Sequence, residues 1–315
     1  MEIMMKNNGL YLDGSNSSLY MKFHKELPSA QGMDVWENRA FILYDTGACG
    51  VYDLESRSPQ PFDFFRLGSY NPGIPSKEYK NHANSCMFSG VHFEGNEIPL
   101  LYVTVGTGIG KDEDGFYYRC AVENITRTVD SEGAEHYSSS LLQVISYEPE
   151  GIEEIAFEAP CWGCPAFFPD SDGGFLYMFS ARYRTKRGCV PEGKKNAYII
   201  TKFPLPGLEA GQMVHLTPKD ILDQFTVESE VLFTQGGALL HNRIYYTFGC
   251  PKCGYPLKMM VFDLEKKCLS AQVEQLDEAF HGEEIECCAC YNGRMLCNTC
   301  DGSIYVLEDG LIPLG

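Results

Sequence analysis

The feature that most constrains this chain is an internal repeat. The segments 31–56 and 235–267 share one plan: Gln-Gly, a short apolar strand, a turn ending in Asn-Arg, a second apolar strand, a Gly/Cys loop, and a strand closing on Asp-Leu-Glu. Three further segments, starting near residues 86, 164 and 287, follow the same order. Self-similarity of this kind is typical of architectures in which neighbouring units bury each other's apolar faces.

Each copy is composed of strands. Runs such as 39–45 (RAFILYD) and 243–249 (RIYYTFG) are rich in Val, Ile, Tyr and Phe and end at Gly, Asn, Asp or Pro. Helical periodicity is nearly absent, and short stretches such as 218–225 are suited to only a turn or two of helix. We therefore predict an all-β fold, a five-bladed β-propeller whose blades are four-stranded antiparallel sheets set radially around a channel.

The last repeat is too short to form a complete blade. The 28 residues after position 287 provide about three strands. The N-terminal segment 18–27 resembles the expected outer strands at 64–70 and 140–148, so we expect it to join the last blade and close the ring. A single domain over residues 1–315 is predicted, with a two-domain β protein as the alternative. The expected blades cover approximately 31–70, 82–150, 160–217, 228–276, and 283–315 together with 18–27.

The charge balance excludes several classes of partner. With 43 acidic and 25 basic residues the formal net charge is −18, which disfavours nucleic acid and anionic membrane surfaces. No apolar run reaches the roughly 18 residues of a transmembrane helix, and the N-terminus lacks the pattern of a signal peptide. These features predict a cytoplasmic protein with no membrane partner.

One mouth of the central channel is the expected functional surface. The first strand of each blade lines the channel, and the loops from strand four to strand one and from strand two to strand three share one face, so side chains from five blades converge there. Their polar, partly acidic character suits a small molecule, such as a sugar, or a protein partner; a wet channel without a ligand is the alternative. The ligand-binding candidates are Asp34, His82, Asn84, Trp162, Arg182, Gln235 and Glu286, with Gln31, Glu283 and Glu284 beside them.

A local resemblance bears on enzymatic activity. The segment 161–180 (CWGCPAFFPDSDGGFLYMFS) resembles the third-blade motif of invertase- and levanase-type glycoside hydrolases, and 86–93 (CMFSGVHF) is similar to their Phe-Ser-Gly segment. The resemblance implies a five-bladed propeller with carboxylates as nucleophile and general acid. However, Gly163 stands at the general-acid position and Ala166 at the following Asp position, so the mechanism does not carry over.

The favoured function is accordingly a non-catalytic binding or scaffold propeller. The alternative is a glycoside-active enzyme with a different carboxylate pair at the channel mouth. The weak catalytic candidates are Asp34 and Glu286, on first strands of adjacent blades, where a separation under ~10 Å would suit glycosidase chemistry.

The chain has 14 cysteines, and two short motifs suggest a metal. The CPKCG run (250–254) resembles the knuckle of zinc ribbons and rubredoxins, and CNTCDG (297–302) occupies the equivalent loop of the next blade. Four thiolates suit a closed tetrahedral Zn(II) site. Free thiols and a disulfide are the alternatives, and no cofactor other than a structural zinc ion is expected. The predicted ligands are Cys250, Cys253, Cys297 and Cys300.

Overall fold

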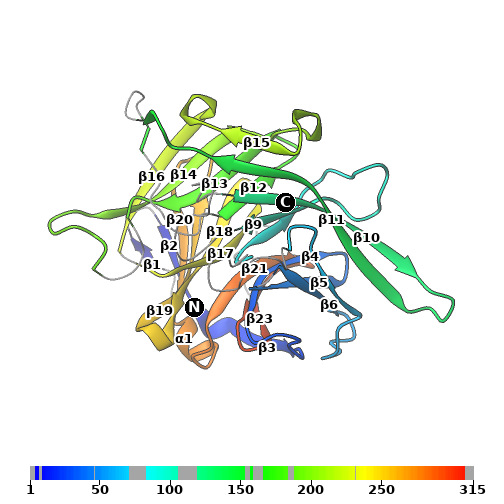
Figure 1. Ribbon diagram of the computed structural model, residues 1–315. Coiled ribbons are helices and arrows are strands. Elements are labelled where there is room, and N and C mark those ends of the chain that lie inside the picture. The colour runs from blue at the N-terminus through cyan, green and yellow to red at the C-terminus, as the bar shows by residue number, and fades with distance from the viewer. Residues whose placement is uncertain are drawn as a thin grey trace.

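The strands form five sheets arranged as a ring, which confirms the predicted five-bladed β-propeller (Figure 1). The computed structural model describes residues 4–6, 9–45, 47–70, 83–105, 119–152, 157–158, 166–183, 188–230 and 232–308. Neighbouring first strands contact one another in the order β4, β8, β12, β17, β21 and back to β4. In the described residues, no helix has the length and apolar character needed to cross a membrane.

Each blade contains four antiparallel strands, which are consecutive in the chain except in blade three and in blade five, where the chain ends meet. Blade one has β4 (Ala30–Trp36), β5 (Arg39–Tyr44), β6 (Ala48–Asp53) and β7 (Asp63–Arg66). Blade two has β8 (Cys86–Phe88), β9 (Leu101–Val105), β10 (Arg119–Val129) and β11 (Glu135–Tyr147). Blade three has β12 (Ala166–Asp170), β13 (Phe175–Ala181), β14 (Asn196–Pro204) and β16 (Asp223–Ser229). Blade four has β17 (Thr234–Leu240), β18 (Arg243–Cys250), β19 (Tyr255–Asp263) and β20 (Cys268–Glu274). Blade five has β21 (Ile285–Tyr291), β22 (Arg294–Thr299), β23 (Ser303–Leu307) and β3 (Ser17–Lys22).

The N-terminal segment closes the ring as predicted. Strand β3 pairs antiparallel with β23, in a register that runs from Ser303 opposite Lys22 to Leu307 opposite Ser17. Tyr20 and Met21 are buried between blades five and one, and the Tyr20 hydroxyl donates a hydrogen bond to the Leu54 carbonyl at 2.8 Å. The strand therefore binds both the last blade and the first.

Two sheets carry extra edge strands that the repeat pattern does not reveal. Strand β15 (Met213–Leu216) pairs in parallel with β11, and β2 (Gly9–Asp13) pairs in parallel with β20 and is extended by β1 (Met4–Lys6). Residues 213–216 therefore join the sheet of blade two, although we expected them in blade three, whose outer strand comes later. This pairing buries apolar surface, because Leu216 packs against blade two in the cluster that also contains Ile145.

The core consists of wedges of apolar side chains between neighbouring blades. Each of the five interfaces has its own cluster of buried residues. Between blades three and four, the rings of Phe179 and Tyr246 stack with centroids 4.0 Å apart. The consecutive residues Cys287 and Cys288 of β21 pack in opposite interfaces, as strand alternation requires.

Candidate functional site

Three first strands carry a β-bulge at the same level of the channel. The pairing shifts between Ala30 and Met33 in β4, between Thr234 and Gly237 in β17, and between Ile285 and Cys287 in β21. A bulge removes a residue from the regular ladder and redirects its side chain. The polar residues inside these bulges are Gln31, Gln235 and Glu286, which are 3%, 5% and 4% exposed.

Backbone from several blades meets at these bulges because glycine follows the polar residue in β4 and β17. The Gly32 amide donates to the Ala83 carbonyl at 2.9 Å. A Cβ atom on Gly236 would lie 2.6 Å from the Asn84 carbonyl oxygen and 2.8 Å from the Glu286 carbonyl oxygen. The Gln-Gly pairs of the repeat therefore allow blades two, four and five to approach closely around the channel.

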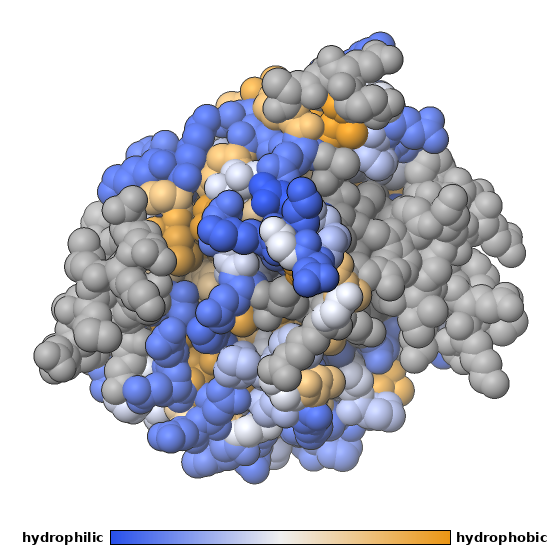
Figure 2. Space-filling view, turned by 90° about the vertical axis from the view of Figure 1, so that its left-hand side faces the viewer, coloured by the Kyte–Doolittle hydropathy of each residue, from blue (hydrophilic) through white to orange (hydrophobic). Residues whose placement is uncertain are grey.

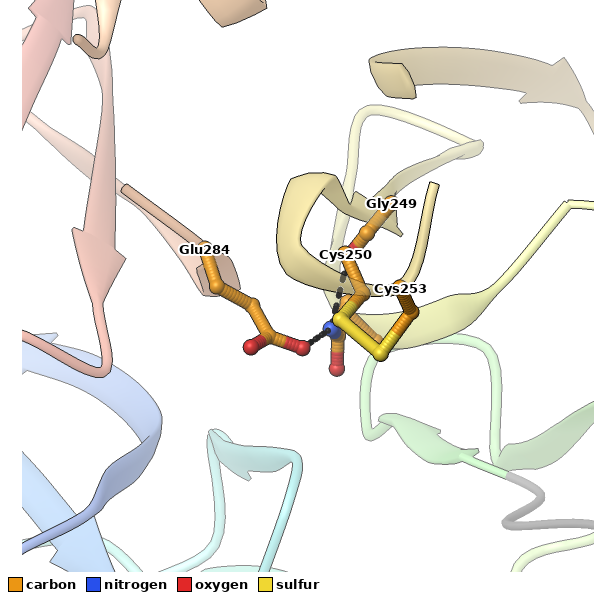
Figure 3. Close-up of a disulfide and its surroundings, with 5 residues drawn as sticks. Gly249, Cys250, Cys253 and Glu284 are labelled. Carbon is orange, nitrogen blue, oxygen red and sulfur yellow. Dashed lines mark hydrogen bonds between the residues drawn. A yellow bond between two sulfur atoms is a disulfide. The ribbon is translucent and has the colours of Figure 1, made fainter. Parts of the chain in front are cut away.

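Gln235 connects two mouth loops through its amide group. Its Nε2 donates to the Gly249 carbonyl at 2.8 Å and to Oε1 of Glu284 at 2.9 Å, and the Cys250–Cys253 disulfide lies beside this junction (Figure 3). Gln235 is thus held by blade four and by the segment leading into blade five. Gln235 and Glu284 therefore lie together at the mouth.

Two more side-chain amides donate hydrogen bonds to main-chain carbonyls of other blades. Asn84 Nδ2 donates to the Gln235 carbonyl at 3.3 Å, and Asn298 Nδ2 donates to the Gln31 carbonyl at 2.7 Å. The side-chain oxygens of Gln31, Asn84 and Asn298 are buried and have no hydrogen-bond partner in the described part of the chain. Such atoms are rare in folded proteins. The mouth cluster, as we name it, consists of Gln31, Asn84, Gln235, Glu284, Glu286 and Asn298.

Acidic groups gather around this cluster. Burial raises the pKa of Glu286 well above its ordinary value, and the nearby carboxylates of Glu284, Asp45 and Asp301 raise it further. One ligand atom each from Glu284, Glu286 and Cys300 lies within 4.8 Å of the others. Burial, followed by the charge of Glu286, raises the pKa of the Cys300 thiol to about 12. Both shifts make ionisation of these side chains less favourable than it is in water.

The structure does not bring the four predicted zinc ligands together. Cys250 and Cys253 form a disulfide across η5 (Pro251–Cys253), with Cα atoms 5.2 Å apart. Cys297 lies within β22 and packs in the core between blades four and five, whereas Cys300 follows the strand and faces the acidic groups. The i, i+3 spacing across a strand end separates the last two sulfurs.

Asp34 lies deeper in the ring and connects blades one and two. Its carboxylate accepts hydrogen bonds from the Val35 amide at 2.8 Å and from the Phe88 amide at 2.5 Å. Burial raises its pKa from about 3.8 to about 7, although both amides oppose the shift. One carboxylate oxygen is thus bound to its own strand, and the other holds the first strand of the next blade.

Asp34 should make folding stability depend on pH. Because the folded state raises its pKa, its contribution to stability is fully present below pH 3.8 and is lost as the pH rises to about 7. At about 1.4 kcal/mol per pH unit, the loss is on the order of 4 kcal/mol. Relative to wild type, Asp34→Asn should therefore gain about that much free energy of unfolding between pH 4 and pH 7, as measured by urea denaturation. A flat profile for Asp34→Asn relative to wild type would contradict the argument.

Of the remaining ligand-binding candidates, Arg182 is the one that the structure describes, and it binds groups outside the mouth cluster. The Arg182 guanidinium forms two hydrogen bonds of 2.7 Å with the Glu158 carboxylate and one of 3.2 Å with the Lys195 carbonyl. His82 and Trp162 lie outside the described residues, as does Gly163 of the glycosidase-like segment.

Sequence reasoning missed Asn298 as a member of the site. The sequence feature that could have indicated it is the position of a polar residue near the end of an otherwise apolar second strand, directly after Cys297. Only the pairing of β21 with β22, which places Asn298 opposite Cys287, shows that it lies beside the Glu286 bulge.

A separate cleft of about 830 Å³ lies on the outer side of blades three and four. Its walls come from β14, β16, β19 and β20, and include Lys195, Glu228, Lys258 and Met260. Figure 2 views the molecule from the side on which β16 and β19 lie in Figure 1, and shows hydrophobic atoms exposed between hydrophilic ones. None of the predicted site residues that the structure describes lines this cleft.

Comparison with known proteins supplies no family. No protein-family model matches the sequence, and no curated protein matches it significantly. Among solved structures, the chain is similar to Myxococcus xanthus glutaminyl cyclase, with 12% identity, 92% of this chain and 94% of that chain covered, and a TM-score of 0.46. It is also similar to the β-propeller domain of Myceliophteria thermophila Cps50 (Swd1), with 12% identity, 90% and 84% coverage, and a TM-score of 0.37. At this distance neither likeness bears on function.

Proposed function

We propose that this protein is a non-catalytic binding propeller, which holds a small ligand carrying cationic N–H donors, free or presented by a protein partner, at the channel mouth. The observation that carries the proposal is the set of three buried amide oxygens, on Gln31, Asn84 and Asn298, that lack a partner in the described residues. Each is an acceptor, and a ligand with several donors would satisfy them.

The charge around the mouth favours a positive ligand. The carboxylates of Glu284, Asp45 and Asp301 act on Glu286 there, and the Lys252 ammonium acts in the opposite sense. Lys25 reaches the same loop, where its Nζ donates a hydrogen bond to the Cys300 carbonyl at 2.8 Å. The Lys252 ammonium lies 3.5 Å from the Asp301 carboxylate, so much of its charge is already matched. An excess of buried or half-buried carboxylate attracts and holds cations.

The glycoside-active alternative has less support. A catalytic pair needs two carboxylates free to act on substrate, and both oxygens of Asp34 already accept main-chain hydrogen bonds. We retain a cytoplasmic location and the absence of nucleic-acid and membrane partners as predictions.

Three sugars of similar size test the proposal. We expect glucosamine to raise the melting temperature in the presence of a chelator, while glucose and glucuronate do not, because only the first carries an ammonium group. Glu284→Gln should weaken the effect, since it removes a charge but keeps an acceptor for Gln235. The exposed Glu230→Gln serves as the control.

Equal stabilisation by glucose and glucosamine, unaffected by Glu284→Gln, would show that charge is not the basis of binding. Turnover of a nitrophenyl glycoside that is lost in Glu286→Gln would favour the enzyme instead.

A further inference from the structure

Two adjoining segments of blade five bring a mixed set of ligand atoms together. Glu284 and Glu286 flank the start of β21, and Cys300 follows the end of β22. The Cys300 amide donates to the Glu284 carbonyl at 3.0 Å, which fixes the two segments to each other. The resulting group of two carboxylate oxygens and one sulfur lies within 4.8 Å.

A second observation concerns the Glu286 carboxylate alone. Glu286 is only 4% exposed, and no hydrogen bond within the described residues reaches its carboxylate. A buried carboxylate without a partner is costly. The neighbouring unpaired oxygens, on Gln31 and Asn298, are acceptors as well and cannot donate to it.

We propose that Glu284, Glu286 and Cys300 bind a borderline divalent metal ion, with Zn(II) as the best match. Zinc accepts carboxylate oxygen and thiolate sulfur together, at roughly 2.0–2.3 Å, whereas Mg(II) and Ca(II) require oxygen ligands. Three protein ligands leave one position of a tetrahedral site open.

This inference deepens the proposed function and rests on it for the role of the mouth as a ligand site. The open position on the ion can take an oxygen atom of the bound molecule, because a protonated amine has no lone pair to coordinate a metal. The site differs from the four-cysteine site expected from the sequence, because it uses Cys300 with two carboxylates and leaves the Cys250–Cys253 disulfide intact.

Cobalt substitution tests the site directly. Full-length protein, treated with chelator and kept without reductant so that the disulfide persists, is titrated with Co(II) alone. We expect one ion per chain, visible absorption typical of tetrahedral Co(II), and a sulfur-to-cobalt charge-transfer band that Zn(II) abolishes by displacement.

Variants assign the ligands. Cys300→Ser should remove the charge-transfer band, and Glu286→Gln, which keeps the side-chain shape, should weaken binding by more than about tenfold, the loss caused even by residues that only support a ligand. Cys189→Ser, on a loop of blade three, is the matched control and should bind as wild type does. Circular dichroism confirms that each variant is folded.

The absence of cobalt bands, or their persistence in Cys300→Ser, would overturn the proposal. Loss of the bands in a Cys250→Ser, Cys253→Ser double variant that is folded would also overturn it and favour the four-cysteine site. Because no sugar is present in this titration, and the glucosamine experiment contains chelator, a failure of one proposal can be told from a failure of the other.

Discussion

Deletion of residues 1–22 should abolish the single cooperative unfolding transition of this protein. The deletion removes β3, which is the outer strand of blade five and the last element of the ring. It takes Tyr20 and Met21 out of the core between blades five and one, and it exposes the backbone of β23 along its whole edge. An open edge of this kind also promotes aggregation. Thermal melts followed by circular dichroism, with light scattering, measure both effects.

A permuted chain separates loss of the strand from loss of the N-terminus as such. In that variant, residues 14–22 are moved behind residue 308 through a short Gly-rich linker, so that β3 follows β23 as a hairpin. This is compatible with their antiparallel pairing. We expect the permuted chain to recover the cooperative transition. A deletion variant that melts like the intact protein would show that the ring does not depend on β3.

Substitution of Gly236 by alanine should destabilise the fold by about 3 kcal/mol or more. The added Cβ would meet main-chain oxygens of Asn84 and Glu286 and the Cys287 sulfur, all within 2.8 Å. The two oxygens belong to the backbone of other blades, so a side-chain rotation cannot relieve the contacts. The blades would have to move apart at the centre of the ring, where five apolar interfaces converge.

Gly90→Ala provides the control for this effect. Its Cβ would meet the Ser171 side chain at 3.5 Å, an ordinary contact. We expect a change in the free energy of unfolding within about 0.5 kcal/mol for Gly90→Ala, as is usual for surface substitutions. Equal effects of the two substitutions in urea denaturation would show that close packing at Gly236 is not what matters.

The sequence by itself determined the architecture. The Gln-Gly repeats, the apolar strands and the shortfall of one strand at the C-terminal end predicted five blades and closure by the N-terminus, because these depend on local patterns and on counting. The same patterns placed Asn84, Gln235 and Glu286 on or just before first strands, where the structure finds them buried at one end of the ring.

Only the tertiary structure decided which of these residues act together. Asn298 belongs to the mouth cluster because cross-strand pairing places it opposite Cys287. Asp34, which we expected at the mouth, does not belong to it, because its carboxylate binds the Phe88 amide. Likewise, Cys300 lies with two glutamates while Cys297, three positions earlier, packs in the core. Bulges and contacts between blades set these directions, and both depend on residues far apart in the chain, which no local pattern records.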